Sequence, residues 1–577
     1  MIGPAIEAER LTFRYEGQEE PVFRDMTFSV RQGETVLFLG PSGCGKSTLL
    51  YCLNRLYPES VDGSLDGAVR IYGRNLSEFA PGEACRRIGT VFQDPDSQFC
   101  MTRVDEEIAF GLENLGIPRR DMDERIIGAL EQAGLLDYRN EKIHTLSGGM
   151  KQRLAVACAL AADPSILILD EPTAQLDPAA ARDLVRWIGR LRRERGLTLL
   201  LVEHRLDEWI GLVDRTLVMD ADGRLSREGT PRAIFSADGA SLTAQGIWMP
   251  TVSKLAFDFR SSGAHSNGEL PVTEEQFIEG VGQLPDTIAL LEERLRSPSP
   301  AERPAASGGS TLCASGLTVR MGRKTVLHSI DLAFRPGELT AIVGTNGSGK
   351  TTLLQHMAGI GGGSVPSGRC LLDGRPLSDW PQHELRRHIG YVFQNPEHQF
   401  VTFTVRDELA FGPRLQGVPE KIVDVEVSKL LQLSGLAGWE EANPFSLSQG
   451  QKRRLSVATM LLDEQRWLLL DEPTFGQDAR TSEQLMTLLR DRANAGMSVI
   501  MVSHDMEAVQ QYAHRVILLV DGRVRYDGVP ARLWSQPGLL ASGGILPPVS
   551  YRLLTRLTAQ LERGDTGAAL RTVESGR

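Results

Sequence analysis

The chain has 577 residues, more than one hydrophobic core supports, so several domains are expected. Its composition, 41% apolar and 24% charged, is that of an ordinary soluble globular protein. The net charge of −11 makes the chain a poor counter-ion for nucleic acid, and no nucleic-acid partner is expected. Met1 to Tyr15 do not resemble a signal peptide, and no uninterrupted apolar run reaches the roughly 18–20 residues that cross a bilayer. We therefore expect a cytoplasmic protein that meets a membrane only through a partner.

The first glycine-rich element follows a predicted strand over Thr35–Leu39. The loop Gly40–Ser47 fits the pattern G-x-x-x-x-G-K-[ST]. Its glycines let backbone N–H groups approach a phosphate closely, and the helix that follows offers its positive N-terminal end to the same anion. Lys46 would reach the β- and γ-phosphates of ATP, and Ser47 would ligate Mg²⁺. The alternative is a glycine-rich turn with a surface lysine.

A second predicted strand, Ser165–Leu169, is followed by two carboxylates, Asp170 and Glu171. An aspartate at the end of such a strand can hold the Mg²⁺ shell, and the next glutamate can polarise the attacking water. A plain strand-to-turn junction is the alternative. Residues 179–195 then place Leu, Val, Trp and Ile at helical spacing. Strands and helices alternate, so the predicted fold class is α/β.

The same motifs return in the second half of the chain. The predicted strand Leu339–Val343 leads into the loop Gly344–Thr351, and Trp467–Leu470 precedes Asp471 and Glu472. The landmark pairs, separated by 304, 301, 301, 301 and 300 residues, are Lys46 and Lys350, Gln93 and Gln394, Ser147 and Ser448, Glu171 and Glu472, and His204 and His504. Five landmarks in register indicate a duplicated domain, and they disfavour a chance surface turn or a plain strand junction.

Each copy is followed by a weaker repeat, GIWMPTVS from Gly246 and GILPPVS from Gly544. Each copy is therefore predicted to carry its own C-terminal extension. Residues 297–310, rich in Pro, Ser, Ala and Gly, are expected to form a flexible linker. The predicted organisation is a first copy at 1–240 with its extension at 241–296, the linker at 297–310, and a second copy at 311–535 with its extension at 536–577.

The motifs Leu146–Arg153 (LSGGMKQR) and Leu447–Arg454 (LSQGQKRR) resemble the signature of the ABC ATPase family, which generic P-loop proteins lack. The resemblance covers nearly the whole chain outside the linker. It implies two tandem P-loop cassettes, each with a parallel core sheet, an antiparallel β subdomain and a helical signature subdomain. It also implies that the cassettes pair head to tail, so that the signature of one caps the ATP bound by the other.

The resemblance assigns roles to matching residues in both copies. The expected catalytic residues are Glu171, Glu472, His204, His504, Gln93 and Gln394. The expected ATP contacts are Tyr15, Gly40, Ser42, Gly43, Gly45, Lys46, Ser47, Thr48, Gly344, Asn346, Gly347, Gly349, Lys350, Thr351 and Thr352, with Ser147, Gly148, Gly149, Ser448, Gln449 and Gly450 from the signatures. The expected Mg²⁺ ligands are Ser47, Gln93, Asp170, Thr351, Gln394 and Asp471. Taken alone, each His would more often be structural, and each Gln a solvated loop residue.

The two copies depart from each other at several of these positions. Tyr15 stands where the family has an adenine-stacking aromatic residue, and its counterpart is Met321. Gln449 replaces a signature Gly in the second copy, and Met150 replaces the usual Gln in the first. Because both copies keep the Lys, Asp, Glu and His, we expect two competent but unequal ATP sites. One silent site is the alternative.

The segments PDSQF, with Gln98, and PEHQF, with Gln399, resemble the ATPases of energy-coupling factor importers for vitamins, vitamin precursors or transition-metal ions. That resemblance implies a transmembrane coupling protein and a small substrate-binding membrane subunit as partners, and a place on the cytoplasmic side of the cell membrane. One alternative is the fused ATPase of a peptide or nickel importer, whose ligand-binding C-terminal tail is not evident. Another is a soluble twin-cassette ribosomal factor, whose linker would be helical and charged.

Overall fold

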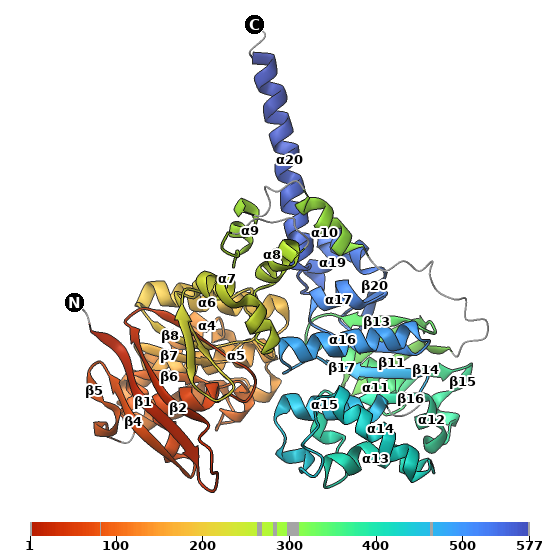
Figure 1. Ribbon diagram of the computed structural model, residues 1–577, viewed down its shortest axis with the longest axis horizontal. Helices are drawn as coiled ribbons and strands as arrows, with labels where there is room; N and C mark the ends of the chain where they lie inside the picture. The colour runs from red at the N-terminus through yellow and green to blue at the C-terminus, as the bar shows by residue number, and fades with distance from the viewer. Residues whose placement is uncertain are drawn as a thin grey trace. The chain divides into compact units, whose positions relative to one another are not determined.

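The chain folds into two units in the computed structural model, which describes residues 3–80, 82–261, 268–280, 286–296, 311–461 and 465–574 (Figure 1). Unit 1 comprises Met1–Leu284 with Asp478–Arg480, and unit 2 comprises Pro285–Gln477 with Thr481–Arg577. The predicted linker at 297–310 lies outside the described residues. Among the helices in these ranges, none is both long enough and apolar enough to span a bilayer.

A six-stranded sheet forms the centre of unit 1. Its strands are β3 (Thr35–Leu39), β6 (Ile88–Val91), β7 (Ile166–Asp170), β8 (Thr198–Val202), β9 (Arg215–Met219) and β10 (Leu225–Gly229). They lie in the order β10-β9-β3-β8-β7-β6, parallel except for β10 at one edge. Every residue of β3, β7 and β8 is buried, which explains their uninterrupted apolar sequences, since parallel sheets are covered on both faces.

A smaller antiparallel sheet, drawn in red in Figure 1, accompanies the central sheet of unit 1. Its strands are β1 (Pro4–Tyr15), β2 (Phe23–Arg31), β4 (Gly63–Ile71) and β5 (Arg74–Asn75), in the order β2-β1-β4-β5. Phe13 of β1 shares a buried core with Phe38 of β3 and with Leu49, which follows the phosphate loop. This core fixes the small sheet against the loop.

The helices of unit 1 include a subdomain that carries the signature. The helices are α1 (Lys46–Leu53), α2 (Leu56–Glu59), α3 (Val104–Asn114), α4 (Arg119–Ala133), α5 (Gly148–Ala161), α6 (Pro178–Arg195), α7 (Pro231–Ala244), α8 (Thr251–Ser261) and α9 (Glu274–Gly280). α3, α4 and α5 pack on one another. The predicted helix at 179–195 is α6, which is capped by Asp177 and ends at the left-handed Gly196.

Unit 2 repeats both sheets. The core strands are β13 (Leu339–Val343), β16 (Ile389–Val392), β17 (Trp467–Asp471), β18 (Ser498–Val502), β19 (Arg515–Val520) and β20 (Arg523–Gly528). The small sheet contains β11 (Leu312–Met321), β12 (Lys324–Phe334), β14 (Ser364–Leu372) and β15 (Arg375–Pro376). The orders, β16-β17-β18-β13-β19-β20 and β12-β11-β14-β15, match unit 1 strand for strand. The predicted α/β fold and the internal duplication are thereby confirmed.

The helices of the second half again include a signature subdomain, in which α13, α14 and α15 pack together. They are α11 (Lys350–Met357), α12 (Gln382–His388), α13 (Val405–Leu415), α14 (Glu420–Leu433), α15 (Gln449–Leu461), α16 (Ala479–Asn494), α17 (Met506–Tyr512), α18 (Pro530–Trp534), α19 (Pro537–Ser542) and α20 (Val549–Glu574). α20, dark blue in Figure 1, extends away from the sheets of unit 2.

The helix that follows each weak repeat is tied to a carboxylate three residues after the landmark histidine. The Thr251 N–H and hydroxyl, at the start of α8, both donate to the Asp207 carboxylate at 2.7 Å. The Ser550 N–H, in the first turn of α20, donates to Glu507 Oε1 at 2.9 Å. A further helix, α10 (Thr287–Leu295), packs on α20 and α17. α10 therefore lies in unit 2, although the sequence prediction placed residues up to 296 with the first copy.

Candidate nucleotide-binding sites

Each phosphate loop connects a central strand to the helix that begins at the lysine of the loop motif, Lys46 or Lys350. Lys46 is buried, and its Nζ donates to Gly40 O and Pro41 O at 2.9 Å each. Lys350 donates in the same way to Gly344 O at 2.9 Å and to Thr345 O at 2.8 Å. The predicted phosphate contacts at 40–48 and 344–352 all lie in these loops or in the first turn of α1 and α11. Each ammonium group is thus held inside its loop, where phosphate oxygens would compete for its protons.

Gly344 has no room for a side chain. Its φ is +151°, and a Cβ there would lie 2.2 Å from Leu519 O in β19. Gly347, at φ +78°, faces open space, so an alanine there adds only a left-handed backbone cost of about 1–2 kcal/mol. We expect Gly344→Ala to lower the melting temperature measured without nucleotide by several degrees more than Gly347→Ala, since about 1 kcal/mol shifts Tm by roughly 2–4 °C at this domain size. Equal shifts would show that β19 can move away from the loop.

At the first site, each carboxylate oxygen of Asp170, at the end of β7, accepts a hydrogen bond from a hydroxyl group. Ser47 Oγ donates to Oδ1 at 3.0 Å, and the Tyr51 hydroxyl donates to Oδ2 at 2.7 Å. Burial raises the pKa of Asp170, and these two hydrogen bonds partly oppose the rise. Tyr51 was not among the predicted site residues. Its place four residues after Ser47, on the same face of α1, is the signal that could have identified it.

At the second site, both carboxylate oxygens of Asp471 are buried, and neither accepts a hydrogen bond of normal geometry. Burial raises the pKa of Asp471 to about 6, against the lowering effects of Thr351, Arg453 and Lys350. Gln355 stands where the first copy has Tyr51. A hydroxyl beside an unsatisfied carboxylate supplies the oxygen ligands that Mg²⁺ prefers, so these residues fit the predicted ion.

The glutamate after each of these aspartates contacts the landmark histidine. Glu171 Oε1 lies 3.0 Å from His204 Nε2, and Glu171 Oε2 accepts a 2.8 Å hydrogen bond from Gln93 Nε2. Glu472 Oε1 lies 3.2 Å from His504 Nε2. Burial tends to raise the pKa of Glu171, but His204, Lys46 and Gln93 outweigh it and hold the pKa below its ordinary value. The Glu171 carboxylate is therefore ionised at neutral pH, as a proton acceptor must be.

Both glutamates adopt the left-handed backbone conformation, with φ of 46° at Glu171 and 50° at Glu472. Such a conformation costs on the order of 1–3 kcal/mol for a residue other than glycine and persists only where the surroundings impose it. The Glu171 N–H donates to Val202 O at 2.8 Å, and the Glu472 N–H donates to Val502 O at 3.2 Å. The same strained turn therefore presents the glutamate in each copy.

Gln98 and Gln399, which lie five residues after Gln93 and Gln394, have different partners. Gln98 Oε1 accepts from the Phe92 N–H at 3.2 Å, at the end of β6. Gln399 Nε2 instead donates to Ser456 O at 2.8 Å and to Thr459 Oγ1 at 2.6 Å, both in α15. The same residue type in the same motif thus braces the segment against a strand in one copy and against the signature helix in the other.

An ion pair that the sequence analysis did not predict joins each signature helix to the segment that follows Gln93 or Gln394. Lys151 Nζ lies 2.7 Å from Asp96, and Lys452 Nζ lies 2.6 Å from Glu397. The two pairs share the 301-residue offset of the duplication, which is the signal that could have revealed them. In the second copy, the buried Arg453 also donates to the backbone carbonyl of Gln394. The exposed Gln394 is therefore anchored through its main chain.

The signature serines cap their helices. Ser147 Oγ accepts from the Met150 N–H at 3.3 Å, and Ser448 Oγ accepts from the Gln451 N–H at 3.3 Å. The Ser448 N–H also donates to Gln451 Oε1 at 2.9 Å, completing a reciprocal capping box. Met150, at the equivalent place, has no acceptor to return that bond. Gly148, Gly149 and Gly450 lie in the same first turns, while the side chain of Gln449 lies outside the described residues.

The predicted adenine contact differs between the copies. The Tyr15 hydroxyl lies 3.3 Å from Thr48 Oγ1, and the Tyr15 ring meets Phe13 edge-on with 5.0 Å between centroids. These contacts hold the ring beside the first turn of α1. Met321, the counterpart in the second copy, is 47% exposed. The structure thus brings an aromatic ring to the first phosphate loop, whereas the counterpart in the second copy is a half-exposed methionine.

Comparison with known proteins places both copies in one family. A sequence profile described as ABC transporter matches residues 23–174 and 327–475. A protein of Bacillus subtilis (strain 168), "Putative HMP/thiamine import ATP-binding protein YkoD", is 43% identical over 549 residues, which cover 94% of this chain and 95% of the relative. A "Putative ABC transporter ATP-binding protein" of Methanosarcina acetivorans is 36% identical over 559 residues, covering 95% and 90%.

Among solved structures, cbiO1 from Clostridium perfringens, described as part of the ABC transporter complex cbiONQ, is 28% identical. It covers 42% of this chain and 95% of its own, with a TM-score of 0.37. The profile matches more than half of the chain, and the two relatives span it almost from end to end. The chain therefore belongs to the ABC transporter family, whose ATP-binding proteins hydrolyse ATP.

Proposed function

We propose that the chain is the ATP-hydrolysing subunit of an importer of the energy-coupling factor type, whose cargo is HMP, thiamine or a closely related vitamin precursor. The observation that carries this proposal is the 43% identity to a protein named for HMP/thiamine import, because it extends over both copies and their extensions. The paired PDSQF and PEHQF segments also support an importer of this type. The chain would work on the cytoplasmic side of the cell membrane, bound to membrane-embedded partners.

In the proposed reaction, each phosphate loop binds the phosphates of one ATP through backbone N–H groups and its lysine. Mg²⁺, held by Ser47 and Asp170 or by Thr351 and Asp471 and contacted by Gln93 or Gln394, would neutralise phosphate charge. The Glu171 and Glu472 carboxylates take a proton from the attacking water, while His204 and His504 contact the γ-phosphate. The signature of the opposite copy completes each site, as the family resemblance implies.

Exposed apolar side chains in the signature subdomain of the second copy support a membrane protein as partner. These side chains are Val401, Phe403, Leu415, Ile422, Val425 and Leu433, each more than half exposed. The equivalent residues of the first copy are Cys100, Thr102, Asn114, Asp121, Glu124 and Gln132. Large exposed apolar patches typically mark binding sites. We infer that the second copy makes the more apolar contact with the proposed coupling protein.

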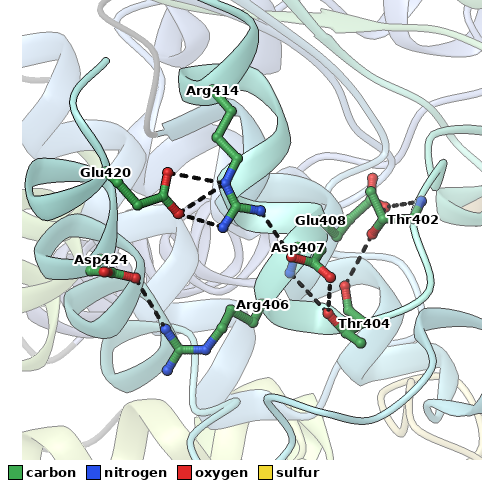
Figure 2. A network of polar contacts seen from close by, with 8 residues as sticks. All are labelled: Thr402, Thr404, Arg406, Asp407, Glu408, Arg414, Glu420 and Asp424. Atoms are coloured by element: carbon green, nitrogen blue, oxygen red, sulfur yellow. Dashed lines mark hydrogen bonds and ion pairs between the residues drawn. The ribbon is translucent and has the colours of Figure 1, made fainter. Parts of the chain in front are cut away.

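A polar network holds the segment that carries Phe403 (Figure 2). The buried Glu408 accepts at Oε2 from the Thr402 N–H at 2.8 Å. The same oxygen accepts from the Val401 N–H at 3.0 Å. Arg414 pairs with Asp407 at 2.9 Å and with Glu420 at 2.5 Å, which joins α13 to α14. The side chain of Phe403, 85% exposed, thus projects from a fixed segment and needs little ordering on binding.

The proposal is tested by detergent extraction of the tagged chain from its native membranes, affinity capture and mass spectrometry. We expect to recover one coupling-type membrane protein and a small hydrophobic binding subunit. Phe403→Ser should weaken the interaction by about 10–100-fold and lower that recovery accordingly, since burying a phenylalanine side chain is worth about 1.5–3 kcal/mol. Leu561→Ser is the matched control, because Leu561 is 59% exposed on α20, outside the signature subdomain, and its loss should leave recovery unchanged.

The cargo is tested separately on the captured small subunit, by calorimetric titration with HMP, thiamine and a divalent transition-metal ion. Binding of HMP or thiamine would support the proposed cargo. Binding of the metal ion alone would contradict the cargo while leaving an importer in place. Recovery of only soluble partners, such as ribosomal proteins, would contradict the importer itself.

A further inference from the structure

Glu203, the residue before His204, is a buried carboxylate that accepts four hydrogen bonds. Its Oε1 accepts from the N–H groups of His204 and Arg205 at 3.2 Å each. Its Oε2 accepts from the Thr173 N–H at 3.3 Å and from the Thr173 hydroxyl at 2.9 Å. The side chain is 2% exposed. Burial and the nearby Glu171 raise the pKa of Glu203 to about 7, against the hydrogen bonds from Thr173 and Arg205.

These four bonds connect the two loops that present Glu171 and His204. Thr173 lies two residues after Glu171, whose own N–H is already tied to Val202 in the adjacent strand β8. The Trp209 Nε1–H also donates to Thr173 Oγ1, at 3.3 Å. The strained left-handed turn at Glu171 is thus bonded to the residues before His204 at two points, the Glu171 N–H and Thr173.

The second copy lacks this connection. Ser503 stands in place of Glu203, and Val509 stands in place of Trp209. The Ser503 hydroxyl accepts from the Asp505 N–H at 3.1 Å, a bond within its own loop. The serine side chain is also too short, and has too few acceptor oxygens, to accept the four hydrogen bonds that Glu203 accepts. The device therefore belongs to the first ATP site alone.

We propose that Glu203 is a positioning residue of the first ATP site, which holds the Glu171 carboxylate and the His204 ring in register by bonding Thr173 on one side and the His204 and Arg205 N–H groups on the other. The chemistry depends on this register, because a displacement of about 1 Å between reacting groups can cost roughly 10²-fold in rate. The inference rests on the ATPase activity of the family and does not depend on the proposed cargo or partners.

The test measures steady-state ATP hydrolysis by the full chain at pH 8, over a range of Mg-ATP concentrations in excess of protein. A Glu472→Gln background reports on the first site, and a Glu171→Gln background reports on the second. Glu203→Gln replaces one of the two accepting oxygens with an N–H₂ group, which then faces two of the four donors. We therefore expect kcat at the first site to fall about 10–100-fold with KM changed by less than about twofold. The same substitution in the Glu171→Gln background should have no further effect, and Ser503→Ala should leave both sites unchanged.

A second pair of variants covers the case in which Glu203→Gln does not fold. Thr173→Ser keeps the hydroxyl that Glu203 accepts and should retain the rate of the first site, whereas Thr173→Val removes it and should lower kcat without raising KM. Equal rates for these two variants would overturn the proposal. So would a Glu203→Gln variant whose kcat matches that of Ser503→Ala, or whose loss falls equally on both sites.

Discussion

Glu171→Gln should remove well over half of the ATPase activity of the chain, and more than Glu472→Gln removes. Each substitution takes away the carboxylate that accepts the proton of the attacking water, and a general base contributes roughly 10²–10⁴-fold to a rate. The double variant should therefore fall by about 10²-fold or more. The residual activities of the two single variants differ because each variant reports the activity of the site that remains intact.

The inequality follows from how the two sites are held. In the first site, Glu171 contacts both His204 and Gln93, and Asp170 receives two hydroxyl donors. In the second, Asp471 has no hydrogen bond of normal geometry and a pKa raised to about 6, mainly by burial. Ordered ligands require less rearrangement when Mg-ATP binds, so the first site should carry the larger share of turnover.

The measurement is steady-state phosphate release at saturating Mg-ATP, with ATP binding followed in parallel to show that both variants still bind nucleotide. Glu208→Gln serves as the control, because Glu208 lies four residues after His204 but pairs with Arg182 at 2.9 Å. Its activity should stay within about twofold of wild type, because this half-buried ion pair involves none of the predicted site residues. If Glu171→Gln and Glu472→Gln each leave about half of the activity, the sites are independent and equivalent.

The central strands and the phosphate loops could be predicted because each has a local sequence pattern. The strands are apolar runs, and the loops fit G-x-x-x-x-G-K-[ST]. β3 and β13 have the predicted bounds, and β7 and β17 each end on the aspartate. A strand that is covered on both faces has an uninterrupted apolar sequence, so the first polar residue marks its end. α6 was found within one residue for the same reason, since its buried stripe repeats at helical spacing.

Contacts between distant segments could not be predicted in this way. Lys151 pairs with Asp96 across 55 residues, and Glu203 reaches Thr173 across 30. Each of these side chains could have pointed to solvent without altering the local pattern. Gln98 and Gln399 show the same limit, since equal motifs bond a strand in one copy and a helix in the other. The destination of such side chains depends on packing between segments.

Lys46→Ala and Lys350→Ala should each remove tight ATP binding from one site and leave the other filled. The Nζ of each lysine is buried and donates to two carbonyls of its loop, so it is already in place to donate to phosphate. Hydrogen bonds to a charged group contribute about 1.5–3 kcal/mol, which corresponds to a loss of roughly 10–100-fold in affinity. Equilibrium titration with a fluorescent ATP analogue should then report one bound nucleotide in place of two.

The two lysine variants should also differ in the affinity that remains. Lys350→Ala leaves the site whose adenine would meet Tyr15, while Lys46→Ala leaves the site that has the exposed Met321. Because stacking of a base on an aromatic ring contributes about 1–3 kcal/mol, ATP should bind Lys350→Ala several-fold to about 100-fold more tightly than Lys46→Ala. Lys142→Ala and Lys421→Ala, at exposed lysines of the two copies, are the controls and should bind two nucleotides as the wild type does. Equal residual affinities would show that adenine stacking on Tyr15 does not distinguish the sites, and the inequality would then have to arise after binding, at the carboxylates.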